Sequence, residues 1–208
     1  MHLPSEAEIR AWPDFTPRTP MRVLVSACLV GIGCGVDGSS YGAPYPHLAP
    51  LFDHPSVRTV AFCPEDFAFG TPRETPDIHG GNGDDVLDGR AQVLNESGDD
   101  WTAAMLQAAQ AMLKLAQHNQ VHLAVLTDIS AACGSQVIYL GSRSDGVHQA
   151  GQGVCAALLA RHGFKVVSQR DHRTIGYLLH KLDPAWAIDG SARDHHETGW
   201  YREHFGSS

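Results

Sequence analysis

The sequence lacks the local cysteine and histidine motifs that mark most metal and redox sites. It contains no Cys-x-x-Cys pair, which excludes zinc fingers, thioredoxin-type redox motifs and ferredoxin-type cluster runs in their usual form. It also contains no His-Glu-x-x-His motif, although it has 13 histidines. Any metal site must therefore be assembled from residues that lie far apart in the sequence.

The chain also lacks a long apolar run and an excess of basic residues. No segment approaches the roughly 18 apolar residues that a membrane-spanning helix needs, so we expect no membrane segment. A net charge of −8 disfavours a broad nucleic-acid surface, although local patches stay open. The five cysteines are an odd number and follow no leader-like segment, which favours a reducing, cytoplasmic setting over a secreted disulfide scaffold.

The sequence does contain short β-branched runs that alternate with amphipathic segments. An apolar spacing of three and four from Trp101 to Leu115 predicts a helix, and residues 153–162 predict another that stops at Gly163. The alternation predicts an α/β fold, a single domain with a mainly parallel sheet flanked by helices. Apolar runs predict its strands at residues 21–26, 57–62, 121–126 and 164–167, with a further short strand at 90–94.

Composition divides the chain into three parts. Four prolines interrupt residues 1–20, which we expect to form an N-terminal arm along the surface. Residues 21–168 hold the predicted α/β domain, with a loop-like stretch at 70–98. Residues 169–208 are expected to form a C-terminal extension, an added helix or arm and not a second core.

Three cysteines fall where predicted strands end. Cys28 and Cys63 follow the first two strands, and Cys133 lies in the loop after the third. A lone cysteine at a strand end is more often a small buried apolar residue than a ligand. Parallel sheets, however, bind ligands at the carboxyl ends of their strands, so these three thiols are expected at one rim.

Five short motifs occur in series along the chain. They are Val-Ser-Ala-Cys-Leu-Val-Gly (25–31), Phe-Cys-Pro-Glu (62–65), Gly-Asp-Asp-Val-Leu-Asp-Gly (83–89), Ser-Ala-Ala-Cys-Gly-Ser (130–135) and Gly-Gln-Gly-Val-Cys-Ala-Ala-Leu-Leu (151–159). In this order they resemble the thiouracil desulfidase family, long catalogued as domain of unknown function 523. The resemblance covers about residues 21–168 and implies an α/β enzyme with an oxygen-sensitive [4Fe-4S] cluster. Such an enzyme removes sulfur from thiolated pyrimidines such as 2-thiouracil without net redox and releases sulfide.

The resemblance implies that Cys28, Cys63 and Cys133 hold the cluster. Thiolates are the usual iron–sulfur ligands, and three of them on four irons leave one iron open. An open iron is a soft Lewis acid suited to the sulfur of a thiocarbonyl. Cys155 is assigned to the core, and Cys34 stays open as a neighbouring or spare thiol.

Two residues are candidates for catalysis. Glu65, two residues after Cys63, is the carboxylate that can activate a water, or else a helix cap or surface carboxylate. Ser130 begins the Ser-x-x-Cys-Gly turn, where it either donates to the substrate or closes its own loop.

Three further residues are candidates for substrate binding. Ser26 precedes Cys28, where a small side chain also permits packing. Asp37, in Val-Asp-Gly, matches a family turn in which a structural Asx turn is the favoured role. Arg73 orients either a loop or a substrate carbonyl. The chain departs from the family around these positions, with Gly35-Val36 before Asp37 and Ala-Ala within the Ser130 motif, which leaves the substrate open.

The leading hypothesis is desulfuration of a small thio-nucleobase, with thiolated tRNA left open although a short acidic chain disfavours it. The alternative is a metal-free or zinc-loaded binding module for a nucleotide-like small ligand. A hydrolase with Cys133 as nucleophile and a histidine base ranks last, because no histidine stands at a motif position.

Overall fold

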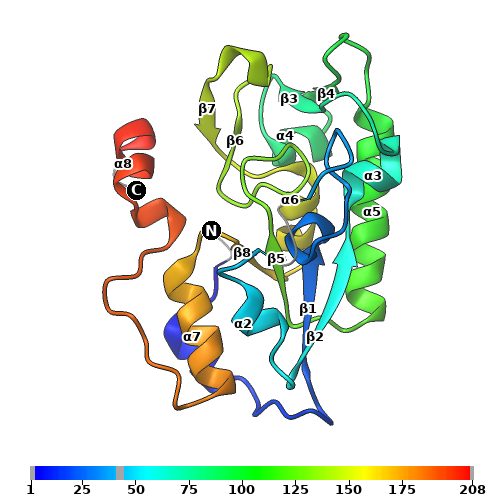
Figure 1. Cartoon of the computed structure of the whole chain (residues 1–208). Helices are drawn as coiled ribbons and strands as arrows, with labels where there is room; N and C mark the ends of the chain where they lie inside the picture. Colours follow the sequence, from blue (N-terminus) through cyan, green and yellow to red (C-terminus); the bar gives the residue numbers. More distant parts are fainter. Residues whose placement is uncertain (1–2, 41–44, 207–208) are drawn as a thin grey trace.

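A four-stranded parallel sheet forms the centre of the molecule in the computed structural model, which describes residues 3–40 and 45–206 (Figure 1). Its strands are β1 (Met21–Ser26), β2 (Val57–Phe62), β5 (Leu123–Leu126) and β8 (Lys165–Ser168), in the order β2-β1-β5-β8. Each of the four predicted strands overlaps one of them, and only β8 extends beyond its predicted run, by one residue. The α/β prediction is confirmed.

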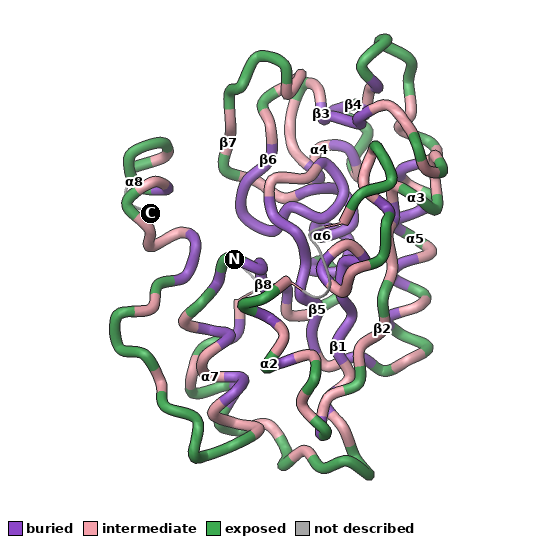
Figure 2. The backbone as a smooth tube through the Cα atoms, in the orientation of Figure 1, coloured by how far each residue is buried: buried purple, intermediate pink, exposed green. Residues whose placement is uncertain are grey.

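The inner strands β1 and β5 are buried on both faces, because consecutive side chains of a strand point to opposite sides and an apolar cluster covers each side. In β1, Leu24 belongs to one apolar cluster while Val23 and Val25 belong to the other. Helices α5 (Thr102–His118) and α6 (Val154–Arg161) cover the Leu24 face, and α1 (Glu6–Ala11), α2 (Ala49–Phe52) and α7 (His172–Leu182) cover the opposite face. Figure 2 shows β1 and β5 buried between these layers.

The strand order creates a crevice at the carboxyl ends of the strands, between β1 and β5. From β1 the chain adds β2 on one side and then β5 and β8 on the other. Loops that leave neighbouring strands toward opposite sides separate there, and open α/β sheets bind ligands at such a point. Cys28 follows β1, and the loop that carries Cys133 follows β5, so both lie beside this crevice.

Two small antiparallel sheets stand beyond the carboxyl edge of the main sheet (Figure 1). One pairs β3 (Asp77–His79) with β4 (Gln92–Leu94), and the other pairs β6 (Val137–Tyr139) with β7 (His148–Ala150). The short helices α3 (Pro64–Phe69) and α4 (Gly83–Leu87) and the 3₁₀ turns η1 (Ala27–Val30) and η2 (Arg143–Asp145) complete this end. The strand predicted at residues 90–94 contains β4, whereas β3, β6 and β7 were not predicted from the sequence.

The prolines of the N-terminal segment border a helix and do not prevent one, contrary to expectation. α1 begins after Pro4 and ends before Pro13. Ser5 and Glu8 form a capping box, in which each side chain accepts a hydrogen bond from the other residue's backbone N–H. This local signal, Ser-Glu-Ala-Glu, was present in the sequence and outweighs the proline content.

The C-terminal segment comprises α7, η3 (His195–Glu197) and α8 (Gly199–Phe205). α7 packs on α1 and α2, and α8 reaches β7 at the other end of the molecule (Figure 1). None of the described helices has the length and apolar character required to cross a bilayer. The division at residues 20 and 168 stays a prediction.

Candidate active site

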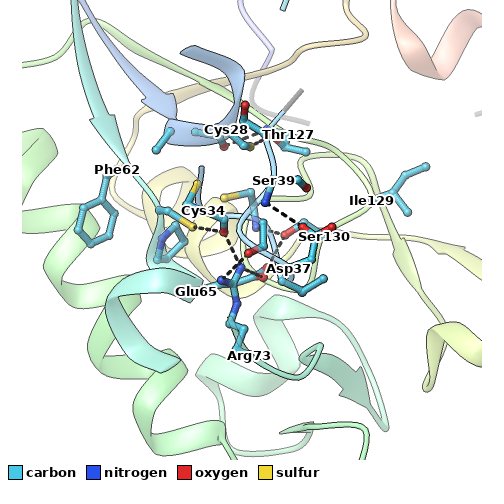
Figure 3. Close-up of a pocket in the computed structure, with 18 of the residues that line it drawn as sticks. Cys28, Cys34, Asp37, Ser39, Phe62, Glu65, Arg73, Thr127, Ile129 and Ser130 are labelled. Carbon is cyan, nitrogen blue, oxygen red and sulfur yellow. Dashed lines mark hydrogen bonds and ion pairs between the residues drawn. The ribbon is translucent and has the colours of Figure 1, made fainter. Parts of the chain in front are cut away.

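A cavity of about 420 Å³ opens at the carboxyl ends of β1, β2 and β5 (Figure 3). Its walls come from the segments that follow these three strands and from the loop around Asp37. The structure brings all eight predicted site residues to this cavity. They are Ser26, Cys28, Asp37, Cys63, Glu65, Arg73, Ser130 and Cys133.

The three predicted ligand thiols reach the cavity from three separate elements. Cys28 lies in η1, Cys63 caps the N-terminus of α3, and Cys133 lies in the loop after β5. All are free thiols; Cys133 is buried and the other two are half-buried. Among the described residues, no three His, Cys, Asp or Glu side chains are close enough to hold a single metal ion. The thiols therefore surround the cavity instead of converging on one point.

Burial raises the pKa of all three thiols, most strongly for Cys133. Without a cation, the neutral thiols are therefore favoured. A bound metal centre reverses this preference because it stabilises thiolates. Three soft donors that face one cavity, with no disulfide between them, fit the ligand set of an iron–sulfur cluster.

The remaining two cysteines occupy different environments. Cys34 is buried and also lines the cavity, and its carbonyl oxygen accepts hydrogen bonds from Arg73 Nη2 at 3.0 Å and Cys63 Sγ at 3.8 Å. Cys155 is fully buried in the core on α6. The cavity thus holds a fourth thiol beside the three predicted ligands.

Glu65 is held in place by two partners that the sequence did not connect. Its Oε1 accepts a hydrogen bond from Ser130 Oγ at 3.0 Å, and its Oε2 forms an ion pair with Arg73 Nη2 at 2.9 Å. The side chains of Arg73 and Glu65 are 3% and 13% exposed. The carboxylate is therefore oriented inside the cavity wall, as Figure 3 shows.

Ser130 closes its own loop, which is one of the two roles that its sequence position suggested; donation to a substrate stays a prediction. Its Oγ accepts hydrogen bonds from the backbone N–H groups of Ala132 and Cys133, at 3.2 and 3.0 Å, which closes the turn. The same hydroxyl donates to Glu65. Ser130 therefore links the Cys133 turn to the carboxylate.

Ser26 and Asp37 make mainly structural contacts. Ser26 Oγ accepts a hydrogen bond from the Thr127 N–H at 3.0 Å and so joins the ends of β1 and β5. Asp37 Oδ1 accepts from the Ser39 N–H at 2.8 Å, which is the contact of an Asx turn. The hydrogen bonds from the Ser39 side chain and backbone lower the pKa of Asp37.

Several residues that line the cavity were not predicted from the sequence, and three of them have polar contacts or a backbone conformation that matter for the site. Thr127 Oγ1 lies 3.1 Å from Cys28 Sγ, and its position directly after β5 was a usable signal. Ile129, two residues after Thr127, also lines the cavity and has a positive φ of 58°. Arg143 lies in the turn between β6 and β7 and lines the cavity. Asp77 of β3 accepts a hydrogen bond from the Arg143 backbone N–H at 2.8 Å and forms an ion pair with the Arg143 guanidinium. No local pattern in the sequence marks Arg143.

Comparison with known proteins decides between the interpretations of this cavity. The family model described as 2-thiouracil desulfurase matches residues 23–171. The chain belongs to the 2-thiouracil desulfurase family. The sequence-based assignment is thereby confirmed.

Two relatives of this family member cover most of its α/β domain. The "uncharacterized protein YbbK" of Bacillus subtilis strain 168 is 39% identical over 150 residues, which are 72% of this chain and 96% of the relative. The solved structure of the "[4Fe-4S]-dependent thiouracil desulfidase TudS" is 36% identical and aligns with a TM-score of 0.59, covering 71% of this chain and 90% of that one.

These matches support the iron–sulfur desulfidase hypothesis over its competitors. A metal-free or zinc-loaded binding module is not favoured by the family or by TudS. The cysteine hydrolase lacks its base, because no histidine is among the described residues that line the cavity.

Proposed function

We propose that this chain is an iron–sulfur-dependent desulfidase that converts a thiolated pyrimidine such as 2-thiouracil to the corresponding carbonyl compound. One observation carries the proposal: Cys28, Cys63 and Cys133 line one cavity in a member of the thiouracil desulfurase family. The [4Fe-4S] dependence named for TudS, at 36% identity, supports the same cofactor here.

We assign Cys28, Cys63 and Cys133 as the three ligands of the cluster. When bound by three thiolates, a [4Fe-4S] cluster supplies an open soft iron that polarises a thiocarbonyl through its sulfur. The buried position of Cys133 protects that side of the site from solvent. Cys34 lies at the same cavity but is not assigned as a ligand.

Glu65 is proposed as the general base. Its carboxylate takes a proton from the water that attacks the thiocarbonyl carbon, as a cavity-facing carboxylate can do. Arg73 and Ser130 hold one carboxylate oxygen each, so the group keeps its orientation. The reaction balances as thiocarbonyl plus water to carbonyl plus hydrogen sulfide, without an oxidant or reductant.

Ser26, Asp37 and Arg143 form parts of the wall around the substrate position. Ser26 and Asp37 already bind backbone N–H groups, so we propose that they shape the cavity. A cavity of about 420 Å³ suits a small thio-nucleobase, and the net charge of −8 favours this substrate over thiolated tRNA. Five free thiols favour a reducing, cytoplasmic location.

The test is anaerobic reconstitution followed by incubation with 2-thiouracil. We expect about four irons per chain, sulfide release and uracil formation in equal amounts. In ¹⁸O-labelled water the uracil must carry one ¹⁸O atom if the carbon is attacked by water. Glu65→Gln should lower kcat by at least about 100-fold with the iron content unchanged. Folded protein that binds no iron under these conditions would refute the proposal.

A further inference from the structure

A buried polar cluster ties the C-terminal segment to the wall of the cavity. The family match ends at residue 171, before η3 and α8. His195 Nδ1 of η3 lies 2.6 Å from Asp128 Oδ2, and the side chains of this pair are 3% and 0% exposed. Two backbone bonds run alongside: the His195 N–H donates to Asp171 and the His196 N–H donates to the side chain of Gln136.

Asp128 closes the loop that presents Ser130 and Cys133. Its Oδ1 accepts hydrogen bonds from three consecutive backbone N–H groups at 3.0–3.2 Å, and Oδ2 is left for His195. Burial opposes ionisation of Asp128, but the hydrogen bond and charge of His195, with two of these N–H groups, hold its pKa below the usual value. The three donors belong to Ser135, Gln136 and Val137.

The same loop contains a conformation that needs such support. Ile129, next to Asp128, has a φ of 58°, a left-handed conformation that a β-branched residue rarely adopts. Such residues persist only where surrounding contacts determine the backbone. Ile129 lines the cavity directly, so a shift at Asp128 is transmitted to the site.

A second contact joins the C-terminal segment to the other end of this wall. Trp200 of α8 stacks on the His195 ring, with centroids 5.5 Å apart and planes at 14°. It also meets His148 of β7 edge-on at 5.4 Å. Because β7 pairs with β6, and the turn between them carries Arg143, Trp200 supports both parts of the wall.

We propose that His195, backed by Trp200, is a positioning residue that holds Asp128 and thereby the loop carrying Ser130 and Cys133. The proposal rests on the proposed function of this cavity. His195 acts at a distance, because it is not among the residues that line the cavity. The C-terminal segment beyond the family match thus has a role in positioning this loop.

The experiment compares His195→Ala and His195→Asn in the full chain. Asparagine keeps an N–H donor for Asp128 but loses the stacked ring, whereas alanine loses both. His180→Ala is the matched control, since this histidine lies on α7, and its Nδ1 is 2.9 Å from the Trp186 carbonyl oxygen. Two readouts need no cluster: hydrogen exchange of the amides of residues 135–137, and the alkylation rate of Cys133 in iron-free protein.

We expect His195→Ala to raise both rates at least about tenfold, while Cys155 in the core stays unreactive. In reconstituted enzyme, kcat should fall at least about tenfold with KM changed less than about threefold. His195→Asn should restore most of each value, and His180→Ala should match the wild type.

Unchanged exchange and alkylation in His195→Ala would overturn the proposal. It would also be overturned if Cys155 became reactive in parallel with Cys133 in both His195 variants, because the effect would then be general unfolding. A wild-type protein without desulfidase activity would instead refute the proposed function, and the two cluster-free readouts would still decide whether His195 positions the loop.

Discussion

Replacing Arg73 by methionine should test how strongly the cavity wall depends on one buried ion pair. The Arg73 side chain is 3% exposed and bonds Glu65, the carbonyl oxygens of Cys34 and Gly70, and Thr71 Oγ1 at 2.9–3.1 Å. Methionine has a similar length but cannot donate, so the Glu65 carboxylate loses its cationic partner. A buried pair that loses one partner costs about 3–5 kcal/mol.

Two features of the structure reduce this loss. Arg73 Nε is buried and has no hydrogen-bond partner among the described residues, so its removal returns about 1 kcal/mol. The cavity is also large enough for water to reach some of the freed acceptors. We therefore expect Arg73→Met to lower the free energy of unfolding by about 2–4 kcal/mol.

Urea unfolding of the iron-free protein measures this loss without a contribution from cluster binding. Arg90→Met is the control, because Arg90 pairs with Asp85 and Asp88 at the surface with its side chain 60% exposed, and an exposed pair contributes little. A double-mutant cycle with Glu65→Gln should give a coupling energy above about 1 kcal/mol. A loss for Arg73→Met no greater than that of the control, or a coupling near zero, would refute the reasoning.

Three further predictions concern the thiols, a buried carboxyl and two glycines. Serine at any of the three proposed ligand positions should reduce iron to below about half of the wild-type content after reconstitution, whereas Cys155→Ser should keep it, as measured by iron per chain. Burial raises the pKa of Asp171 to about 7, so between about pH 4 and 7 the folded state binds a proton that the unfolded state releases, and the free energy of unfolding should fall as pH rises through this range. Asp171→Asn should abolish this part of the pH dependence in urea titrations. An unchanged dependence in this variant would contradict the prediction. A Cβ at Gly153 would lie 2.6 Å from the Ser130 carbonyl oxygen, so Gly153→Ala should displace the Cys133 loop and lower kcat at least about tenfold. Gly176 in α7 has no atom within 4 Å of an added Cβ, so Gly176→Ala should raise the free energy of unfolding by about 0.5–1 kcal/mol. Equal activity losses in the two glycine variants would contradict the role of the Cys133 loop.

The sequence was sufficient for the main sheet and the broad position of the site. The strands of such a parallel sheet are apolar over most of their length, so their pattern is visible without knowledge of their neighbours. The position where such a strand ends is also visible locally in the sequence. These positions predicted that Cys28, Cys63 and Cys133 lie at one rim of the sheet. The order of five motifs then indicated the family. The ligand and catalytic roles of the individual residues stay predictions.

Local pattern was insufficient where short segments depend on distant partners. The β6–β7 pair and Arg143 have no periodic signal, and Arg143 is positioned by Asp77, which is 66 residues away. In the N-terminal segment, the prolines predicted an arm without a helix, and the structure has α1 there. The capping box of Ser5 and Glu8 that begins α1 is a local signal of the sequence.

By itself, the sequence determined the α/β class, the strand-end thiols and the membership of a desulfurase family. Only the tertiary structure decided that Glu65 bonds both Ser130 and Arg73, and that His195 reaches Asp128 from 67 residues away. The reason is physical: periodicity records which face of an element is buried, whereas a hydrogen bond requires two atoms within about 3 Å. The paths of the intervening loops set that distance, and these paths depend on the packing of the whole chain.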